Sequence, residues 1–367
     1  MNNVSKKMGL LTAGVAVASL LIGCATKVDD IEVSSPSLGS TVLVYTSDFA
    51  SGALHWVDSS GVSTPSLEFN QDAKIVTSGQ YAYVLERSAA ANISRIDVKQ
   101  LSKGTAAIQY QQSLGNSANP EDVAIVNNAL GWIALSGRAQ LLAFNPETGA
   151  LTDSVSLAQF SQEGENSPNP TSLVLKGDTL CVIMQRLQMW DPTMPGLVAL
   201  LNAKTGALID TLQLKGSNPN GAVLVGSKLY IANSGSSMNA TIDATKSLDV
   251  VDLSTGSVAV FVSGATLGGG PSGLTVDAAS GILYVGVYKD FGDEPVAAVR
   301  IVDQSVSEIA GVVDSFGGLA YDSVAGLLYV GDREFGKEAV KVWNGSTLQT
   351  LDGHSSLPAY GIAVASY

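Results

Sequence analysis

The stretch NPNGAVLVGSKLYI, residues 218–231, decides the fold. It opens with Asn218-Pro219-Asn220-Gly221, where proline fixes φ for a turn and Asn or Gly accepts the tight backbone geometry. A short strand follows, and the apolar triplet Leu229-Tyr230-Ile231 is typical of a second strand. The same combination of turn, strand and triplet recurs along the 367-residue chain, which predicts a repeat protein.

The apolar triplet occurs seven times, and the steps between its central residues are 40, 49, 49, 49, 54 and 45 residues. These lengths match one four-stranded blade of a β-propeller with its loops. Glycine-containing hairpin turns at residues 145–149, 202–206 and 252–256 are expected to join the third strand of a blade to its fourth. The seven triplets are Val42-Leu43-Val44, Ala82-Tyr83-Val84, Gly131-Trp132-Ile133, Leu180-Cys181-Val182, Leu229-Tyr230-Ile231, Leu283-Tyr284-Val285 and Leu328-Tyr329-Val330.

The two ends of the repeat array complement each other. The first triplet lacks a leading strand, and the chain finishes with a leading strand, residues 359–366, that has no repeat after it. Pairing the two removes the open edge that a linear array would expose. The sequence therefore predicts an all-β fold: a seven-bladed β-propeller of four-stranded antiparallel blades, closed by the C-terminal strand completing the first blade.

The motifs Asn-Pro-x-Gly, Leu-Tyr-Val and Asp-x-x-Thr-Gly, spread over residues 41–367, resemble the YVTN-type and lactonase-like propeller repeats. This resemblance implies the propeller fold for that segment. Its implications for activity are open, because propellers host unrelated functions, lactonases and lyases among them.

The N-terminus is typical of an export signal. Lys6 and Lys7 precede the uncharged residues 8–22, a run too short to span the ~30 Å bilayer core as a permanent helix. Leu21-Ile22-Gly23-Cys24 then resembles the lipobox of bacterial lipoproteins. The resemblance implies a signal peptide over residues 1–23, lipidation of Cys24 and a flexible tether over residues 24–40, whereas an ordinary secretory signal is the alternative.

Lipidation would attach the protein to a membrane through its anchor alone. Ala25, and no Asp, follows the cysteine. By the sorting rule of that family, we expect outer-membrane localisation, facing either the periplasm or the cell surface.

Composition excludes several classes of partner and cofactor. Without residues 1–23 the chain holds 18 basic and 33 acidic residues, a net charge near −15 that argues against nucleic-acid binding. Once Cys24 is lipidated, Cys181 has no disulfide partner within the chain, and it is expected to be a buried apolar side chain. No Cys-x-x-Cys-His haem-attachment motif occurs, and we expect no cofactor.

Candidate binding residues gather in the loops between second and third strands, which are long in blades 4 to 7. Aromatic side chains in loops are candidates for ligand or partner contacts, unless they fold back to fill gaps between blades. Arginines that follow the triplet in four blades would converge on one mouth of the ring, unless they form salt bridges between blades with Asp48, Glu86 or Asp332. The candidates are Arg87, Arg138, Arg186, Trp190, Tyr288, Phe291, Arg333 and Phe335.

Two weaker signals concern metal binding and catalysis. Asp290, Asp293 and Glu294 could ligate Ca²⁺, but EF-hand spacing is missing, and an exposed acidic loop is the alternative. His55 lies in an alternating strand and is expected to be structural. His354 remains as the candidate general base.

These observations favour a non-enzymatic role. We expect an outer-membrane-anchored propeller that binds a small molecule, a glycan or an envelope protein through its loop-rich mouth. The alternative is a propeller enzyme of lactonase or lyase type that uses His354.

Overall fold

The computed structural model describes residues 39–58, 61–63, 66–88, 90–236, 241–351 and 357–367. The predicted signal peptide, Cys24 and most of the predicted tether lie outside these ranges, as does His354. Within the described ranges no helix is long and apolar enough to cross a membrane.

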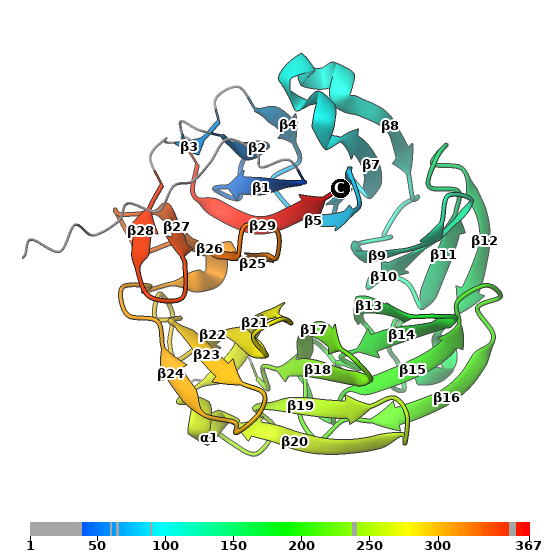
Figure 1. Cartoon of the computed structure of the whole chain (residues 1–367). Helices are drawn as coiled ribbons and strands as arrows, with labels where there is room; N and C mark the ends of the chain where they lie inside the picture. The colour runs from blue at the N-terminus through cyan, green and yellow to red at the C-terminus, as the bar shows by residue number, and fades with distance from the viewer. Residues whose placement is uncertain (1–38, 59–60, 64–65, 89, 237–240, 352–356) are drawn as a thin grey trace, which may run out of the picture. The chain divides into compact units, whose positions relative to one another are not determined.

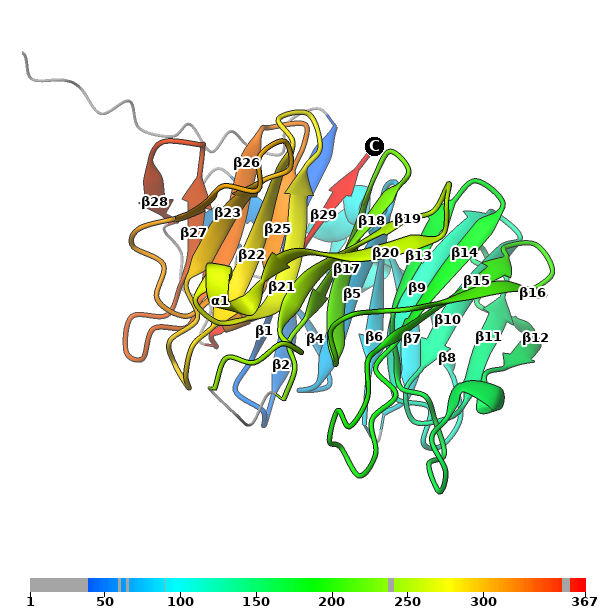
Figure 2. The same cartoon turned by 90° about the horizontal axis from the view of Figure 1, so that it is seen from below.

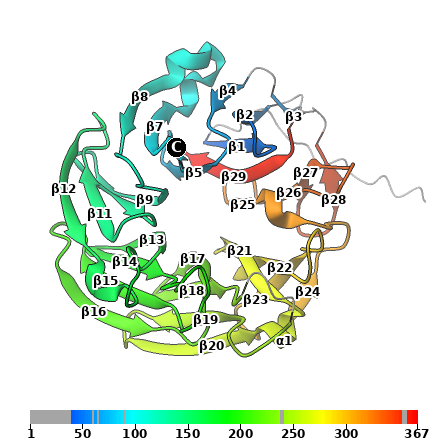
Figure 3. The ribbon, with the colours of Figure 1, turned by 180° about the vertical axis from the view of Figure 1, so that it is seen from behind.

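Seven antiparallel sheets form a ring of blades, as both views along its axis show (Figures 1 and 3). In each blade one strand lies innermost, and the strand that contains the apolar triplet lies second. The innermost strands are β29 (Ala359–Ser366), β5 (Ala73–Ser78), β9 (Pro120–Asn127), β13 (Pro170–Lys176), β17 (Pro219–Val225), β21 (Gly270–Asp277) and β25 (Leu319–Asp322). The second strands are β1 (Ser40–Ser47), β6 (Tyr81–Glu86), β10 (Leu130–Leu135), β14 (Thr179–Met184), β18 (Lys228–Asn233), β22 (Ile282–Tyr288) and β26 (Leu327–Asp332).

Two further layers complete each blade toward the outside. The third strands are β2 (Gly52–Asp58), β7 (Asn92–Asp97), β11 (Gln140–Phe144), β15 (Leu197–Asn202), β19 (Ser247–Asp252), β23 (Val296–Arg300) and β27 (Ala339–Trp343). The outermost strands are β8 (Ile108–Ser113), β12 (Leu151–Ser156), β16 (Leu208–Gln213), β20 (Ser257–Ser263), β24 (Val306–Glu308) and β28 (Leu348–Thr350). In the first blade two short strands, β3 (Gly61–Val62) and β4 (Leu67–Phe69), both pair with β2 and share the outermost place.

Short helical elements occur only in connections of the described chain. They are the 3₁₀ elements η1 (Val98–Ala107), η2 (Ala158–Phe160) and η3 (Ser315–Gly317), and the one-turn helix α1 (Gly264–Leu267). The element η1 is interrupted by Gly104, whose φ of 62° is not helical.

The predicted closure of the ring is confirmed. Strand β29 pairs antiparallel with β1, in a register that places Ala363 opposite Leu43. The hydroxyl of Thr77, on the innermost strand of the next blade, also donates to the carbonyl of Val364 at 2.7 Å. The last strand of the chain therefore completes the first blade and contacts the second.

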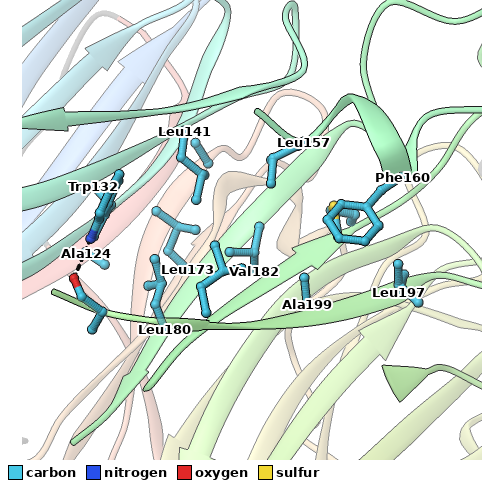
Figure 4. Close-up of a cluster of buried hydrophobic side chains, with 14 of the residues drawn as sticks. Ala124, Trp132, Leu141, Leu157, Phe160, Leu173, Leu180, Val182, Leu197 and Ala199 are labelled. Atoms are coloured by element: carbon cyan, nitrogen blue, oxygen red, sulfur yellow. Dashed lines mark hydrogen bonds between the residues drawn. The ribbon is translucent and has the colours of Figure 1, made fainter. Parts of the chain in front are cut away.

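Side chains of the second strands point alternately to the two faces of each blade and form the hydrophobic core between neighbouring blades. Trp132 belongs to the cluster between blades 3 and 4, whereas Ile133, one residue later, belongs to the cluster between blades 2 and 3. Period-2 geometry explains this, because successive side chains of a strand point to opposite faces. Figure 4 shows the first of these clusters, in which the Trp132 indole N–H donates to the carbonyl of Ala203 at 2.7 Å. Each large side chain buried in this way contributes roughly 1.5–3 kcal/mol of hydrophobic stabilisation.

Cys181 occupies the position that an aromatic side chain takes in other blades. It is fully buried between blades 4 and 5 with Leu229 and Ile231, and burial raises the pKa of its thiol to about 11. The prediction of a buried apolar side chain is confirmed.

Candidate functional site

The connections of the blades form two different rims. We call loop rim the face with the loops between second and third strands and the connections between blades, and hairpin rim the face with the tight turns; the side view separates them (Figure 2). Between the rims, the seven innermost strands line a central channel that encloses about 460 Å³. Its polar lining includes Thr77, Asp122, Ser172 and Tyr321.

Asp122 carries the one carboxylate of this lining. Both of its oxygens accept backbone N–H groups, from Val123 and Leu173, at 2.7 Å each. Burial still raises the pKa of Asp122 to about 6. The channel therefore holds a carboxyl group whose pKa lies above its usual value.

Bulges shape the loop-rim entrance of the channel. In five blades the pairing of the innermost strand shifts by one residue near its start, so that one extra residue stands out of the ladder. A β-bulge of this kind re-aims a side chain. The extra residues are Glu121, Thr171, Asn220, Ser272 and Tyr360.

Arg87 joins two of these bulged residues in a charged network. Its guanidinium lies 2.5 Å from the carboxylate of Asp72 and 3.2 Å from that of Glu121, and it donates to the Tyr360 hydroxyl at 3.0 Å. Lys74 contacts Glu121 at 2.6 Å. Burial alone would raise the pKa of Glu121, but Lys74 and Arg87 outweigh it and hold the pKa below its usual value.

The alternative of an inter-blade salt bridge is thus correct for Arg87, but the expected partners were wrong. Asp48 accepts from the backbone of its own loop, at Ala50 and Ser51. Asp332 pairs instead with Lys341 at 2.5 Å.

The four candidate arginines do not converge on one ligand position. Arg138 donates to the carbonyl of Leu114 at 2.6 Å, and Arg186 donates to that of Phe160 at 3.2 Å. Both arginines, like Arg87, therefore hold neighbouring connections together. Arg333 instead lies beside aromatic rings, and its buried Nη1, like the Nε of Arg138, has no hydrogen-bond partner within the described ranges.

Arg333 is part of an exposed aromatic group that we call the mouth cluster: Phe49, Phe316, Tyr360 and Arg333. The Phe49 ring meets the Tyr360 ring edge-on, with 5.3 Å between centroids, and Phe316 lies 6.1 Å from the same ring. The Arg333 guanidinium carbon lies 5.4 Å from the Phe49 centroid and 5.6 Å from the Phe316 centroid, within cation–π range. Phe49 and Phe316 are 57% and 52% exposed.

The sequence analysis missed Phe49, Phe316 and Tyr360. A usable signal existed, because Phe49 and Phe316 both stand in polar loops that need no core side chain. Loop length does not single out these three residues, because they come from blade 1 and from connections between blades.

Three predicted aromatic residues project from the loop rim. Trp190 is 84% exposed, Phe291 96% and Phe335 97%. They do not fill gaps between blades, which was the alternative for each. Tyr288, the last residue of β22, is half-buried and does not project in this way.

The acidic candidates separate into two environments. Asp290 and Asp293 are exposed and close a turn, whereas Glu294 is buried and accepts from the hydroxyls of Ser272 at 2.6 Å and Ser315 at 3.4 Å. Burial raises the pKa of Glu294 to about 7, against the lowering effect of the Ser272 hydrogen bond. Over the described ranges no three His, Cys, Asp or Glu side chains form a group that could hold a metal ion.

His55 is structural, as expected. It is buried, its Nδ1 lies 2.7 Å from the carbonyl of Ser63, and burial lowers its pKa.

Comparison with known proteins finds likeness in fold alone. No protein-family model matches the sequence, and no curated protein matches it. Among solved structures, a candidate 6-phosphogluconolactonase from Bacteroides fragilis is 12% identical with a TM-score of 0.65, over 90% of this chain and 99% of that one. Hydrazine synthase of Kuenenia stuttgartiensis is 12% identical with a TM-score of 0.59, over 84% and 95%. The computationally designed Ika8 protein is 14% identical with a TM-score of 0.54, over 87% and 86%.

Proposed function

We propose that this chain is a lipid-anchored binding protein of the outer membrane, whose loop rim receives a ligand or an envelope protein. One observation carries the binding role: in the described ranges, every Phe and Trp side chain that is more than half exposed lies on the loop rim. These are Phe49, Trp190, Phe291, Phe316 and Phe335. Exposed apolar residues on the hairpin rim include Val302, Val324 and Tyr367. The aromatic one, Tyr367, is 42% exposed.

Two physical arguments support this reading of the asymmetry. Aromatic side chains are among the residues that most often anchor interfaces, and their exposure to water is unfavourable when nothing covers them. Folding alone does not require a large aromatic side chain at an exposed loop position, because such a side chain buries little apolar area there. The anchoring half of the proposal depends on Cys24 and the lipobox-like residues before it.

The test compares the two rims by substitution. Native mass spectrometry of the protein purified from its own host should detect a retained ligand or partner. Trp190→Ala and Arg333→Ala should each weaken its retention by about 1–3 kcal/mol. Glu147→Ala and Lys204→Ala, in hairpin turns of the opposite rim, are the matched controls and should leave retention unchanged. Equal losses from both rims would contradict the proposal.

The second candidate is a propeller enzyme of lactonase or lyase type with His354 as its general base. The likeness in fold to the candidate 6-phosphogluconolactonase supports it. In that case the parent protein would hydrolyse members of a sugar-lactone panel, and His354→Ala would abolish turnover while ligand binding persists. We expect no turnover on the panel.

A further inference from the structure

We propose that three loop tips on blades 4, 6 and 7 form a docking surface for a protein whose facing surface is basic and has apolar recesses. We call them the aromatic tips: Met189 with Trp190, Phe291, and Phe335. The inference rests on the proposed function, because the tips belong to the loop rim, but it names a place on that rim and a class of partner.

The tip of blade 4 is built against local conformational preference. Gln188 and Asp191 exchange two backbone hydrogen bonds of 2.9 Å around the two-residue loop Met189-Trp190. Both loop residues adopt positive φ, 50° and 69°, a conformation that favours Asn or Gly. Large apolar side chains stand there instead, 85% and 84% exposed. Backbone strain that displays a side chain to solvent points to a function for that side chain.

This tip is also held in place from outside its own loop. Glu165, in the preceding connection, accepts the backbone N–H of Met189 at 2.7 Å. Gln162, in the same connection, contacts the hydroxyl of Thr193 at 3.0 Å. A tip that is fixed before binding loses less conformational entropy when a partner arrives.

The tips of blades 6 and 7 repeat one design. Phe291-Gly292 and Phe335-Gly336 occupy the centres of turns in which residue 293 donates to the carbonyl of residue 290 at 3.0 Å, and residue 337 to that of residue 334 at 2.8 Å. Both glycines have a φ of 74°. The turn chemistry requires the glycine but not the phenylalanine, which is 96% or 97% exposed. The recurrence of an acidic residue, Phe and Gly at two neighbouring tips is therefore better explained by a shared contact than by folding.

The charges around the tips select the partner. Asp191, Asp290, Asp293 and Glu338 are exposed, and none of them forms an ion pair with another described residue. The whole chain carries a net charge of −13. A second copy would present the same carboxylates, and an anionic bilayer would repel them. A basic protein surface matches them and could receive the aromatic side chains in recesses.

The experiment places the photo-crosslinking residue benzoylphenylalanine, one site at a time, in the full chain expressed in its own host. Sites 190, 291 and 335 test the tips, site 316 tests the mouth cluster, and sites 302 and 324 are exposed controls on the hairpin rim. We expect the three tip sites to yield adducts with one and the same protein, at least tenfold above the controls. The triple substitution Asp191→Lys, Asp290→Lys and Asp293→Lys should lower that yield at least fivefold.

The captured protein is then purified and titrated with the parent chain. Its affinity for the triple variant Trp190→Ala, Phe291→Ala, Phe335→Ala should be at least tenfold lower than for the parent chain. The control variant Val302→Ala, Val324→Ala should bind with unchanged affinity. Added salt should weaken binding to the parent chain. Tip adducts only with lipid or with a second copy would overturn the inference. Adducts from site 316 without any from the tips would overturn it and leave the proposed function standing, whereas the absence of adducts from all loop-rim sites would contradict both.

Discussion

At the scale of single residues, the turn at Met189 and Trp190 shows a conflict between folding and another requirement. A non-glycine residue in the left-handed region costs roughly 1–2 kcal/mol. The double variant Met189→Asn, Trp190→Gly supplies the residues that this turn prefers. We expect its free energy of unfolding in urea to rise by about 1–2 kcal/mol, and its binding to the native partner to fall. Phe291→Ala, at a tip without positive φ at the aromatic residue, is the control and should leave stability unchanged. Lower stability of the double variant would show that the two side chains serve the fold.

Glu294 gives a pH-dependent prediction at the same scale. Burial raises the pKa of this carboxyl to about 7, whereas in the unfolded chain it titrates near 4.3. The folded state therefore binds the proton more tightly, and the associated stability, complete below about pH 4, is lost as pH rises toward 7. Glu294→Gln removes this loss and keeps an acceptor for the Ser272 hydroxyl.

We expect the advantage of Glu294→Gln over the parent to grow by up to about 3 kcal/mol between pH 4 and pH 8, measured by urea unfolding. Glu163→Gln, at an exposed position that forms no ion pair with another described residue, is the matched control. Parallel pH profiles of Glu294→Gln and the parent would contradict the raised pKa.

At the scale of elements, the C-terminal strand closes the ring. Removal of residues 358–367 deletes β29, unpairs the inner edge of β1 and exposes buried backbone groups along it. Soluble expression of this truncated chain should collapse, because both the first blade and its contact with Thr77 are lost. Removal of the tether residues 25–35 is the matched deletion and should leave the melting temperature of the soluble protein unchanged. A C-terminal truncation that melts like the parent would show that β29 is dispensable.

Most elements could be predicted because their signals are local. The triplet around Trp132 or Tyr284 alternates between two faces, and the turn residues before and after it fix its ends. The pattern of turn, strand and triplet is weak in one blade, but its recurrence in seven blades makes the prediction of the fold strong. Two features could not be predicted in this way: the outermost place in the first blade is shared by β3 and β4, and η1 is inserted between β7 and β8. Neither follows the repeat.

The candidate site was predicted less completely, because it depends on closure of the ring. Phe49 and Tyr360 are 311 positions apart in the sequence, yet their rings lie 5.3 Å apart once β29 joins β1. The ion pair between Arg87 and Glu121 likewise depends on the neighbouring blade, in which Glu121 stands at a bulge. The loops that carry Trp190 and Phe335 could be identified from their length, but the outward direction of these side chains could not.

At the scale of the whole molecule, the proposed function combines a lipid anchor with a ring whose most exposed Phe and Trp side chains lie on one rim. The anchoring proposal rests on Cys24. We expect Cys24→Ser to block incorporation of labelled palmitate in the native host and to leave the protein uncleaved or released from the membrane fraction. Cys181→Ser, which removes the buried thiol instead, is the control and should retain the label. Labelled palmitate in the Cys24→Ser protein would contradict lipidation at this residue.

Hydrogen–deuterium exchange can show whether the loop rim is the binding face. The purified chain is measured alone and with detergent-solubilised envelope from a host strain that lacks it. We expect slower exchange in the envelope sample at residues 48–51, 186–194, 289–294, 314–317 and 333–338. The hairpin-rim turns at residues 145–149 and 203–206 should exchange as before. Protection confined to those turns or to the outermost strands, with the loop rim unchanged, would contradict the proposed binding face.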